Sequence, residues 1–232
     1  MKYGAMLILL GLAQLALAYP LRPVSWLIGW SGLSWVVAGC GYAFLGARVF
    51  GKQKDGRLPL GNVVLLLPFL LVTWLLWHLQ IALSKEPHHV EVAPGLWLGR
   101  RCYARELPPD IQTLVDLTAE FAEPSTAREG RVYLCLPTLD ASIPTVSAFN
   151  DLVESIARSE APVYLHCALG HGRSATVIVA VLVAKGIDTS LASAEQRVKA
   201  ARPGIEINAA QQALLQQWWS ARSVPGAAPS NR

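Results

Sequence analysis

The residues from His166 to Ser174, His-Cys-Ala-Leu-Gly-His-Gly-Arg-Ser, place a thiol, an arginine and a hydroxyl within one short segment. An apolar run enters this segment at residues 162–165 and another leaves it at residues 175–184, which predicts a strand, a tight loop and the first turn of a helix. Cys167 would then lie at the mouth of a helix, where the partial positive charge favours anions. The chemistry expected here is nucleophilic attack by a thiolate.

The loop after the cysteine is suited to hold a phosphate group. Five residues separate Cys167 from Arg173, namely Ala168, Leu169, Gly170, His171 and Gly172. The two glycines permit backbone dihedrals that turn successive N–H groups toward one point. Arg173 adds a planar fork of donors that can bind two phosphate oxygens, and the same field favours the thiolate form of Cys167. No Gly-Lys-Ser/Thr closes the loop, which excludes a Walker-type nucleotide site. A buried structural cysteine before a helix is the alternative.

This arrangement of cysteine, five residues, arginine and serine, preceded by histidine, resembles the signature loop of the protein tyrosine phosphatase superfamily. The resemblance is best to the compact dual-specificity phosphatases and covers about residues 88–221. It implies a phosphoric monoester hydrolase with a phosphocysteine intermediate and no metal or other cofactor. By the same resemblance, Ser174 hydrogen-bonds the sulfur and eases its departure, and His166 tunes the nucleophile from behind the loop.

A phosphatase of this type needs an acid that protonates the departing oxygen. Asp140 follows a predicted strand in the sequence Leu-Pro-Thr-Leu-Asp, and the resemblance gives the role of general acid to an aspartate on this loop. The alternative is that Asp140 is a turn residue or the cap of the following helix. Asp116, within the predicted strand over residues 113–117, is expected to make a buried or strand-edge hydrogen bond instead.

Glu120 and Phe121 are candidates for contacting the substrate. They resemble an acidic and aromatic segment that lines the substrate pocket of the mitochondrial phosphatidylglycerophosphate phosphatase. Ala168 and His171, however, stand where that enzyme and the phosphoinositide phosphatases often place basic residues. The resemblance therefore points to a phosphorylated lipid, and less to a highly charged inositol headgroup.

The elements around these residues alternate between strands and helices. Short strands are predicted at residues 90–92 and 96–98, around the turn signal Pro94-Gly95, and at 113–117, 131–136 and 162–166. Helices are predicted from residues 142–144 onward, over 175–184, after Thr189 or Ser190, and after Asn208; the first of them buries Phe149, Leu152, Val153 and Ile156. This order predicts an α/β domain with a single sheet flanked by helices over residues 88–222, followed by a disordered tail at 223–232.

Cys135 lies on the predicted strand over residues 131–136, which would neighbour the strand that ends at Cys167. A disulfide between the two would protect an oxidised nucleophile. The alternative is that Cys135 is a small buried core residue.

The first third of the chain has the composition of a membrane region. Three stretches, residues 3–21, 23–47 and 58–84, contain no Asp, Glu, Lys or Arg, and a membrane span needs about 20 apolar residues. We expect a multi-pass region over residues 1–87, with spans at 3–20, 24–46 and 60–83. The second span is rich in small residues, as closely packed membrane helices are. The alternative for the first span is a signal peptide that is cleaved after Ala16-Leu17-Ala18.

Charge supports this division of the chain. Residues 1–87 carry seven Lys and Arg against two Asp and Glu, whereas residues 88–232 carry thirteen against fourteen. The second part is nearly neutral and shows no nucleic-acid footprint. The basic loop between the second and third spans favours a catalytic domain outside the cytoplasm, while a thiolate nucleophile favours a reducing compartment. These two arguments leave the side of the membrane open. His88 and His89 form a polar linker rather than a metal site.

The leading hypothesis is a membrane-anchored phosphatase whose substrate lies at the membrane surface and is a phospholipid monoester. Its first alternative is a phosphotyrosine or phosphoserine protein phosphatase of dual specificity. Two other classes would fit parts of the sequence: an inactive relative that binds phosphorylated ligands, and a membrane assembly protein whose second domain docks a partner. The inactive relative is disfavoured because Cys167, Arg173 and Asp140 are all present.

Overall fold

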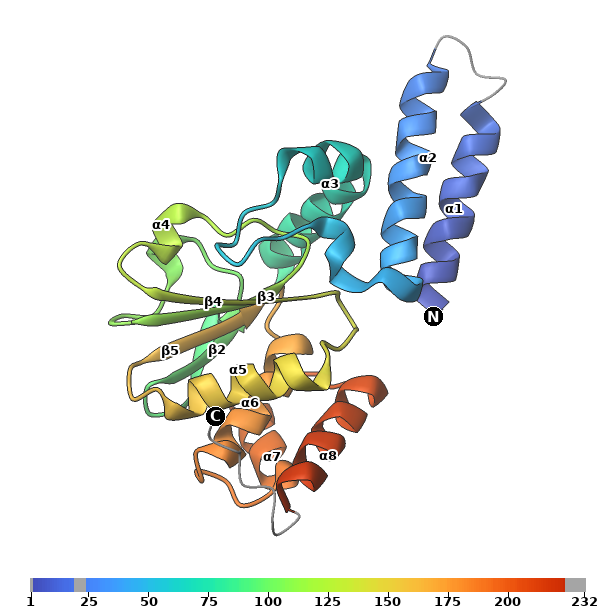
Figure 1. Ribbon diagram of the computed structural model, residues 1–232. Helices are drawn as coiled ribbons and strands as arrows, with labels where there is room; N and C mark the ends of the chain where they lie inside the picture. The colour runs from blue at the N-terminus through green and yellow to red at the C-terminus, as the bar shows by residue number, and fades with distance from the viewer. Residues whose placement is uncertain (1, 19–23, 224–232) are drawn as a thin grey trace, which may run out of the picture. The chain divides into compact units, whose positions relative to one another are not determined.

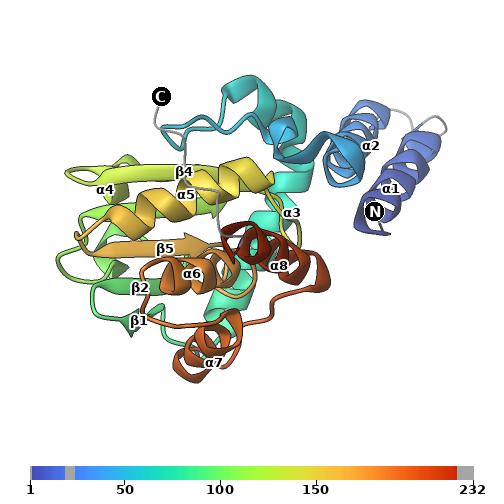
Figure 2. The ribbon, with the colours of Figure 1, turned by 60° about the horizontal axis from the view of Figure 1, so that its bottom comes forward.

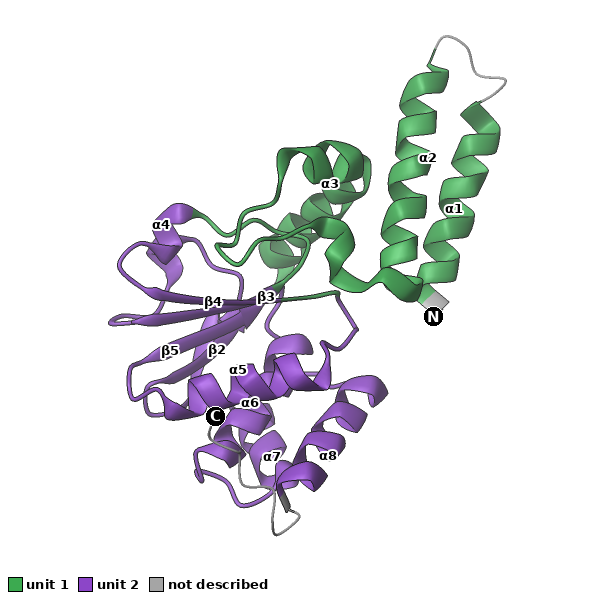
Figure 3. Ribbon diagram, viewed as in Figure 1, with its two compact units in different colours: residues 1–86, 118–124, 137–139 green, residues 87–117, 125–136, 140–232 purple. Residues whose placement is uncertain are grey.

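The computed structural model describes residues 2–18 and 24–223 (Figure 1). The chain divides into two compact units, coloured separately in Figure 3. We call residues 1–86, 118–124 and 137–139 the helical unit, and residues 87–117, 125–136 and 140–232 the sheet unit. The helical unit therefore includes two short segments that follow strands of the sheet. The expected tail beyond residue 223 lies outside the described residues.

A five-stranded sheet in the order β1-β2-β5-β3-β4 is the framework of the fold. Its strands are β1 (His89–Ala93), β2 (Leu96–Arg100), β3 (Thr113–Thr118), β4 (Val132–Thr138) and β5 (Val163–Cys167). β1 and β2 form an antiparallel hairpin, with Gly95 at a φ of 72° in the turn between them. β5 runs parallel to both β2 and β3, so the carboxyl ends of these three strands meet at one edge. Ligands of α/β proteins bind at such an edge.

Four helices of the sheet unit are α5 (Val146–Arg158), α6 (Arg173–Ala184), α7 (Leu191–Ala201) and α8 (Ala209–Ser223). α5 and α6 lie along one face of the sheet (Figure 2), and α6 is buried over almost its whole length. The predicted apolar face of α5 is confirmed, since Phe149, Leu152, Val153 and Ile156 are all buried. The predicted α/β class and the flanking of the sheet by helices are confirmed as well.

The ends of the helices follow their capping residues. The side chain of Thr145 caps α5, so this helix begins at Val146, two residues after the predicted start. Ser190 caps α7, and the Asn208 side chain accepts a hydrogen bond from the backbone N–H of Gln211 in the first turn of α8, as predicted. The short helix α4 (Ser125–Arg128) and the 3₁₀ turn η3 (Ala104–Glu106) were not predicted.

Three helices form the bulk of the helical unit: α1 (Lys2–Ala18), α2 (Ser25–Cys40) and α3 (Leu60–Leu83). α2 continues into a π-helical segment η1 (Gly41–Leu45) and a 3₁₀ segment η2 (Gly46–Phe50). α1 and α2 pack closely because glycines face each other. A Cβ atom at Gly11 would lie 2.6 Å from the carbonyl oxygen of Gly32, and one at Gly32 would lie 2.7 Å from that of Gly11. These small residues bring two backbones together, as expected for the glycine-rich second span.

Two helical stretches among the described residues, Ser25–Phe50 and Leu60–Leu83, are long and apolar enough to cross a membrane. α1, where the first span was expected, has 17 residues and does not reach that length. The expectation of three spans is thus supported for two of them, and by length and composition alone.

The expected adjacency of the strands that carry Cys135 and Cys167 is wrong. β3 lies between β4, which carries Cys135, and β5, which ends at Cys167. Neighbouring strands are about 4.8 Å apart, so two strand spacings exceed the Cα separation that a disulfide allows. Cys135 therefore lacks the position that protection of Cys167 would need.

Candidate active site

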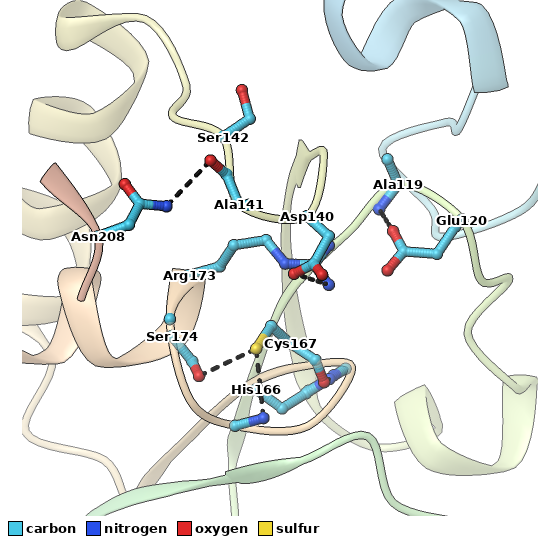
Figure 4. A network of polar contacts seen from close by, with 12 residues as sticks. Ala119, Glu120, Asp140, Ala141, Ser142, His166, Cys167, Arg173, Ser174 and Asn208 are labelled. Carbon is cyan, nitrogen blue, oxygen red and sulfur yellow. Dashed lines mark hydrogen bonds and ion pairs between the residues drawn. The ribbon is translucent and has the colours of Figure 1, made fainter. Parts of the chain in front are cut away.

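Cys167 ends β5, and its side chain is buried with only 3% of the residue exposed. Its sulfur makes two hydrogen bonds (Figure 4): it accepts one from the backbone N–H of Gly170 at 3.3 Å, and it shares one with the hydroxyl of Ser174, whose Oγ lies at 3.3 Å. Both contacts lie within the sheet unit. The sulfur thus lies at the start of the loop, within reach of an amide and a hydroxyl group.

The loop between Cys167 and α6 turns its carbonyl groups outward. The carbonyl oxygen of Ala168 accepts a hydrogen bond from the Arg101 N–H at 3.1 Å, and that of Leu169 accepts one from the guanidinium of Arg202 at 3.0 Å. The Gly172 carbonyl accepts from Thr176 in the first turn of α6. Because the carbonyls bond to outer partners, successive N–H groups can face the opposite, inner side. An anion cradle would need this orientation of the N–H groups.

The tight turn of this loop requires a glycine at position 170. Its φ of 79° lies in the left-handed region, and a Cβ atom there would lie 2.8 Å from the backbone nitrogen of Arg100. Any other residue would push the loop away from β2 and would carry backbone strain. The glycine therefore fixes the position of the N–H that bonds to the sulfur of Cys167.

Arg173 and Asp140 form the second part of the site. The Arg173 guanidinium is 1% exposed and lies 3.3 Å, measured from Nη2 to Oδ1, from the Asp140 carboxylate, whose side chain is 73% exposed. A buried arginine at the first position of α6 adds its charge to the helix N-terminus. The exposed carboxylate can reach a group that enters from solvent. The structure thus brings the proposed nucleophile, phosphate-binding arginine and general acid into one unit.

The loop that carries Asp140 is held by the start of α8. Ala141 has a φ of 54°, a conformation that is rare for a residue other than glycine. Its carbonyl oxygen accepts a hydrogen bond from the Asn208 side-chain amide at 3.0 Å, and the Ser142 carbonyl accepts one from the Gln211 side chain at 3.3 Å. These bonds offset the strain at Ala141 and fix the direction in which Asp140 leaves the backbone.

His166 lies behind the loop and is fully buried. Its ring stacks on Tyr164 at a centroid distance of 5.7 Å, and its Nδ1 lies 3.2 Å from the carbonyl oxygen of Cys167. Tyr164 in turn donates to the Arg100 carbonyl, and burial, followed by the Cys102 thiol, raises the pKa of Tyr164 well above its usual value. Tyr164 therefore keeps its proton while its ring packs on that of His166.

Asp116 is fully buried and accepts a hydrogen bond of 2.7 Å from the hydroxyl of Tyr133. Burial, and after it the charge of Asp116, raises the pKa of Tyr133, so its hydroxyl remains a donor. The sequence-based expectation of a buried hydrogen bond for Asp116 is confirmed.

Glu120 and Phe121, the predicted substrate contacts, belong to the helical unit. Both are buried: the Glu120 carboxylate accepts a hydrogen bond from the Ala119 N–H at 2.8 Å, and the Phe121 ring packs on Trp77 at 5.3 Å between centroids. The Glu120 side chain thus bonds to its neighbour in the chain, and the Phe121 ring packs on α3.

Sequence reasoning missed two residues that shape the site. Arg202 holds the Leu169 carbonyl and also donates to the Pro87 carbonyl at 2.9 Å, although it is only 3% exposed. Gln211 holds the loop after Asp140. Arg202 follows the end of α7, where basic residues are common, so its position in the sequence gave no signal of this role. Asn208 was predicted as a cap but not as a donor to the acid loop.

Comparison with known proteins identifies this arrangement. A family model described as a DSP-PTPase phosphatase of a polymorphic toxin system matches residues 103–187, a range that includes Asp140 and the whole loop after Cys167. A solved variant of human DUSP28 is similar at 28% identity and a TM-score of 0.52, over 59% of this chain and 97% of that one. Residues 103–187 thus match a dual-specificity phosphatase domain, and the similar solved structures indicate a phosphoric monoester hydrolase of the protein tyrosine phosphatase type.

Other solved structures resemble the dual-specificity phosphatase domain. Tk-PTP in its active form is 26% identical, with a TM-score of 0.52 over 58% of this chain and 97% of that one. PTPMT1, solved in complex with PI(5)P, is 22% identical with a TM-score of 0.50, over 59% of this chain and 99% of that one, and at this identity shows the fold alone. No match was found among curated proteins.

Proposed function

We propose that the chain is a membrane-anchored phosphatase that acts through a phosphocysteine intermediate. The Cys167 thiolate attacks phosphorus, a P–S bond forms, and the ester P–O bond breaks. Asp140 gives its proton to the departing oxygen. The loop N–H groups and Arg173 stabilise the negative charge spread over the equatorial oxygens.

The second step returns the enzyme to its starting state. The ionised Asp140 takes a proton from water, the water oxygen attacks phosphorus, and the P–S bond breaks to release inorganic phosphate. The Ser174 hydroxyl, 3.3 Å from the sulfur, stabilises the departing thiolate. One carboxyl group serves as acid and then as base, so no further titrating group is required.

The observation that carries this proposal is the pair of hydrogen bonds at the Cys167 sulfur, combined with the Arg173 and Asp140 pair in the same unit. A structural cysteine needs neither an outward-turned carbonyl loop nor a buried arginine beside it. An inactive ligand-binding relative would have no use for an exposed carboxylate next to that arginine.

Membrane anchoring is supported by exposed apolar faces on the N-terminal helices. α3 exposes a stripe of large apolar side chains: Leu60, Val64, Leu71, Leu75, Leu79 and Leu83. A stripe of this length exceeds what a water-soluble surface normally exposes. α2 with its continuation is the second stretch of sufficient length. We propose that these helices, together with α1, anchor the protein as a multi-pass region.

A phospholipid monoester is the proposed substrate. α3 ends at Leu83 and β1 begins at His89, so the connection to the sheet unit is only a few residues long. A site held this near a bilayer meets lipid substrates at high effective concentration. A phosphotyrosine or phosphoserine protein is the second candidate, favoured by the similarity to dual-specificity phosphatases.

A turnover screen on the full-length protein in mixed micelles tests the proposal. Phosphatidate, phosphatidylglycerophosphate, phosphotyrosyl peptides and phosphoseryl peptides are compared by release of inorganic phosphate. We expect the lipids to be hydrolysed faster, and Cys167→Ser to abolish turnover while orthovanadate still binds, because the cradle remains. Turnover above a few per cent in Cys167→Ser would refute the covalent mechanism. Much faster hydrolysis of the peptides would replace the lipid substrate by a phosphoprotein.

A further inference from the structure

The segment of residues 118–124, which continues β3, is held by the loop between the second and third N-terminal helices. The Lys52 ammonium group donates to the Thr118 carbonyl oxygen at 2.9 Å and to the Thr118 hydroxyl at 2.9 Å. Further along, the Glu123 N–H donates to the Gly56 carbonyl at 2.9 Å. Both ends of the segment are therefore bonded to the α2–α3 loop, and all these contacts lie within the helical unit.

The middle of the same segment is held by α3. The Trp74 indole N–H donates to the Glu120 carbonyl at 2.9 Å, and the Trp77 ring packs on Phe121. Trp77 is only 3% exposed, so its contact with Phe121 excludes water. One apolar helix thus supplies both a hydrogen-bond donor and a packing surface to a segment of non-helical backbone.

The second segment of the helical unit, residues 137–139, is bound in a similar way. Leu139 is 3% exposed and belongs to the apolar cluster that contains Phe50 and Leu66. Leu139 directly precedes Asp140 in the chain. The N-terminal helices therefore also pack on the residue before the proposed general acid.

The position of these segments in the chain gives the contacts a functional meaning. In the sheet unit β3 runs parallel to β5, with Asp116 opposite His166, the residue before Cys167. Segment 118–124 begins two residues after Asp116, at the carboxyl end where α/β proteins bind ligands. If the N-terminal helices only anchored the protein, they would not need a lysine and an indole that donate hydrogen bonds to backbone carbonyls of this segment.

We infer that Lys52 and Trp74 are positioning residues, which hold segment 118–124 in the conformation that recognises the substrate beyond its phosphate group. The N-terminal helices are then part of the substrate-recognition apparatus as well as an anchor. This inference rests on the proposed function, because it assigns recognition of the rest of the substrate to a segment of that same enzyme.

The test compares substrates of different size in the full-length protein. Lys52→Met removes the two donors to Thr118, with Lys54→Met as the matched control, because Lys54 lies in the same loop and is exposed. Trp74→Phe removes the donor to Glu120. Its control is Trp30→Phe, since the Trp30 indole donates to the Val64 carbonyl at 3.0 Å within the helices.

For Lys52→Met and Trp74→Phe we expect kcat/KM toward the preferred lipid or peptide to fall about 5- to 20-fold, mainly through KM. Turnover of a small aryl phosphate should stay within about twofold, because it needs only the cradle and the acid. Lys52→Arg should recover most of the loss, since a donor returns. The two control variants should match the wild type on both substrates.

Three results would overturn the inference: no change in kcat/KM, equal losses on large and small substrates, or equal losses in the controls. If the wild type proves to turn over no phosphate ester, the proposed function fails, and amide hydrogen exchange still tests the positioning. Exchange over residues 118–123 should then be about tenfold faster in Lys52→Met than in Lys54→Met. Equal exchange in the two variants would contradict the inference independently.

Discussion

The hydrogen bond from Asn208 to the loop of the proposed general acid can be removed without removing the helix cap. In Asn208→Ser, a side-chain oxygen remains to cap α8, but the amide that donates to the Ala141 carbonyl at 3.0 Å is lost. Of its two bonds to the start of α8, the loop then keeps the longer one, from the Gln211 side chain to the Ser142 carbonyl. Ala141 is held at a φ of 54°, so its strain is no longer offset by the first bond.

The size of the effect follows from the lost bond. A neutral hydrogen bond contributes about 0.5 to 1.5 kcal/mol to the stability of the native loop conformation. Its loss lowers the population of correctly placed Asp140 by up to about 2- to 10-fold, since about 1.4 kcal/mol is a factor of ten. The rate of steps that need the acid should fall by the same factor.

The assay is a series of aryl phosphates with leaving groups of increasing acidity. For Asn208→Ser we expect the full loss of kcat/KM, about 2- to 10-fold, with phenyl phosphate, and no measurable loss with a strongly activated ester, which needs no proton. In the double variant Asn208→Ser/Ala141→Gly, part of the lost kcat/KM should return, because glycine adopts the left-handed conformation without strain. Equal losses across the series would show that Asn208 acts only on stability, and the reasoning would be refuted.

Three further predictions address other parts of the site. Asp140→Ala should lower the rate about 10²- to 10⁴-fold on phenyl phosphate and much less on activated esters, and a loss independent of the leaving group would make Asp140 structural. Gly170→Ala should abolish turnover and tungstate binding together, because the added Cβ would lie 2.8 Å from the Arg100 nitrogen; retained binding in a calorimetric titration would contradict this. Burial, and then the nearby charge of His88, lowers the pKa of His89 below its ordinary 6.5, so the folded state binds fewer protons than the unfolded chain and stability falls as the pH drops below about 6.5. His89→Gln should flatten this loss in urea unfolding at pH 7.5 and 5.5, and an unchanged pH dependence would exclude His89 as its source.

Local sequence signals were sufficient for the strands, for the helices α5 to α8 and for the loop after Cys167, but not for the short helix α4. The loop could be predicted because its chemistry is contiguous in the chain: nucleophile, glycines, arginine and serine all follow one strand. Capping was predicted at Asn208 because an asparagine before an apolar periodic run is a local pattern. The bond from the same side chain to Ala141 joins residues 67 positions apart, and no local pattern encodes it.

Strand order was not predictable from the same signals. The sequence predicts strands at residues 131–136 and 162–166. Whether another strand lies between them in the sheet depends on long-range pairing. Insertion of β3 between β4 and β5 separates Cys135 from Cys167. The role of Arg202 could not be predicted for a related reason. It depends on hydrogen bonds to the carbonyl groups of Pro87 and Leu169, which are distant from Arg202 in the sequence.

The hydropathy of α3 could not predict which of its faces packs on protein. All its faces are apolar, so the sequence does not distinguish the face that packs on protein, with Leu66, Leu70 and Trp77, from the exposed face. The non-helical segment 118–124 packs on the first of these faces, and polar backbone at membrane depth is tolerated only where protein buries it. If α3 inserts into a bilayer as we propose, lipid can therefore contact only its exposed stripe. Helix and segment 118–124 would then move together as parts of the helical unit.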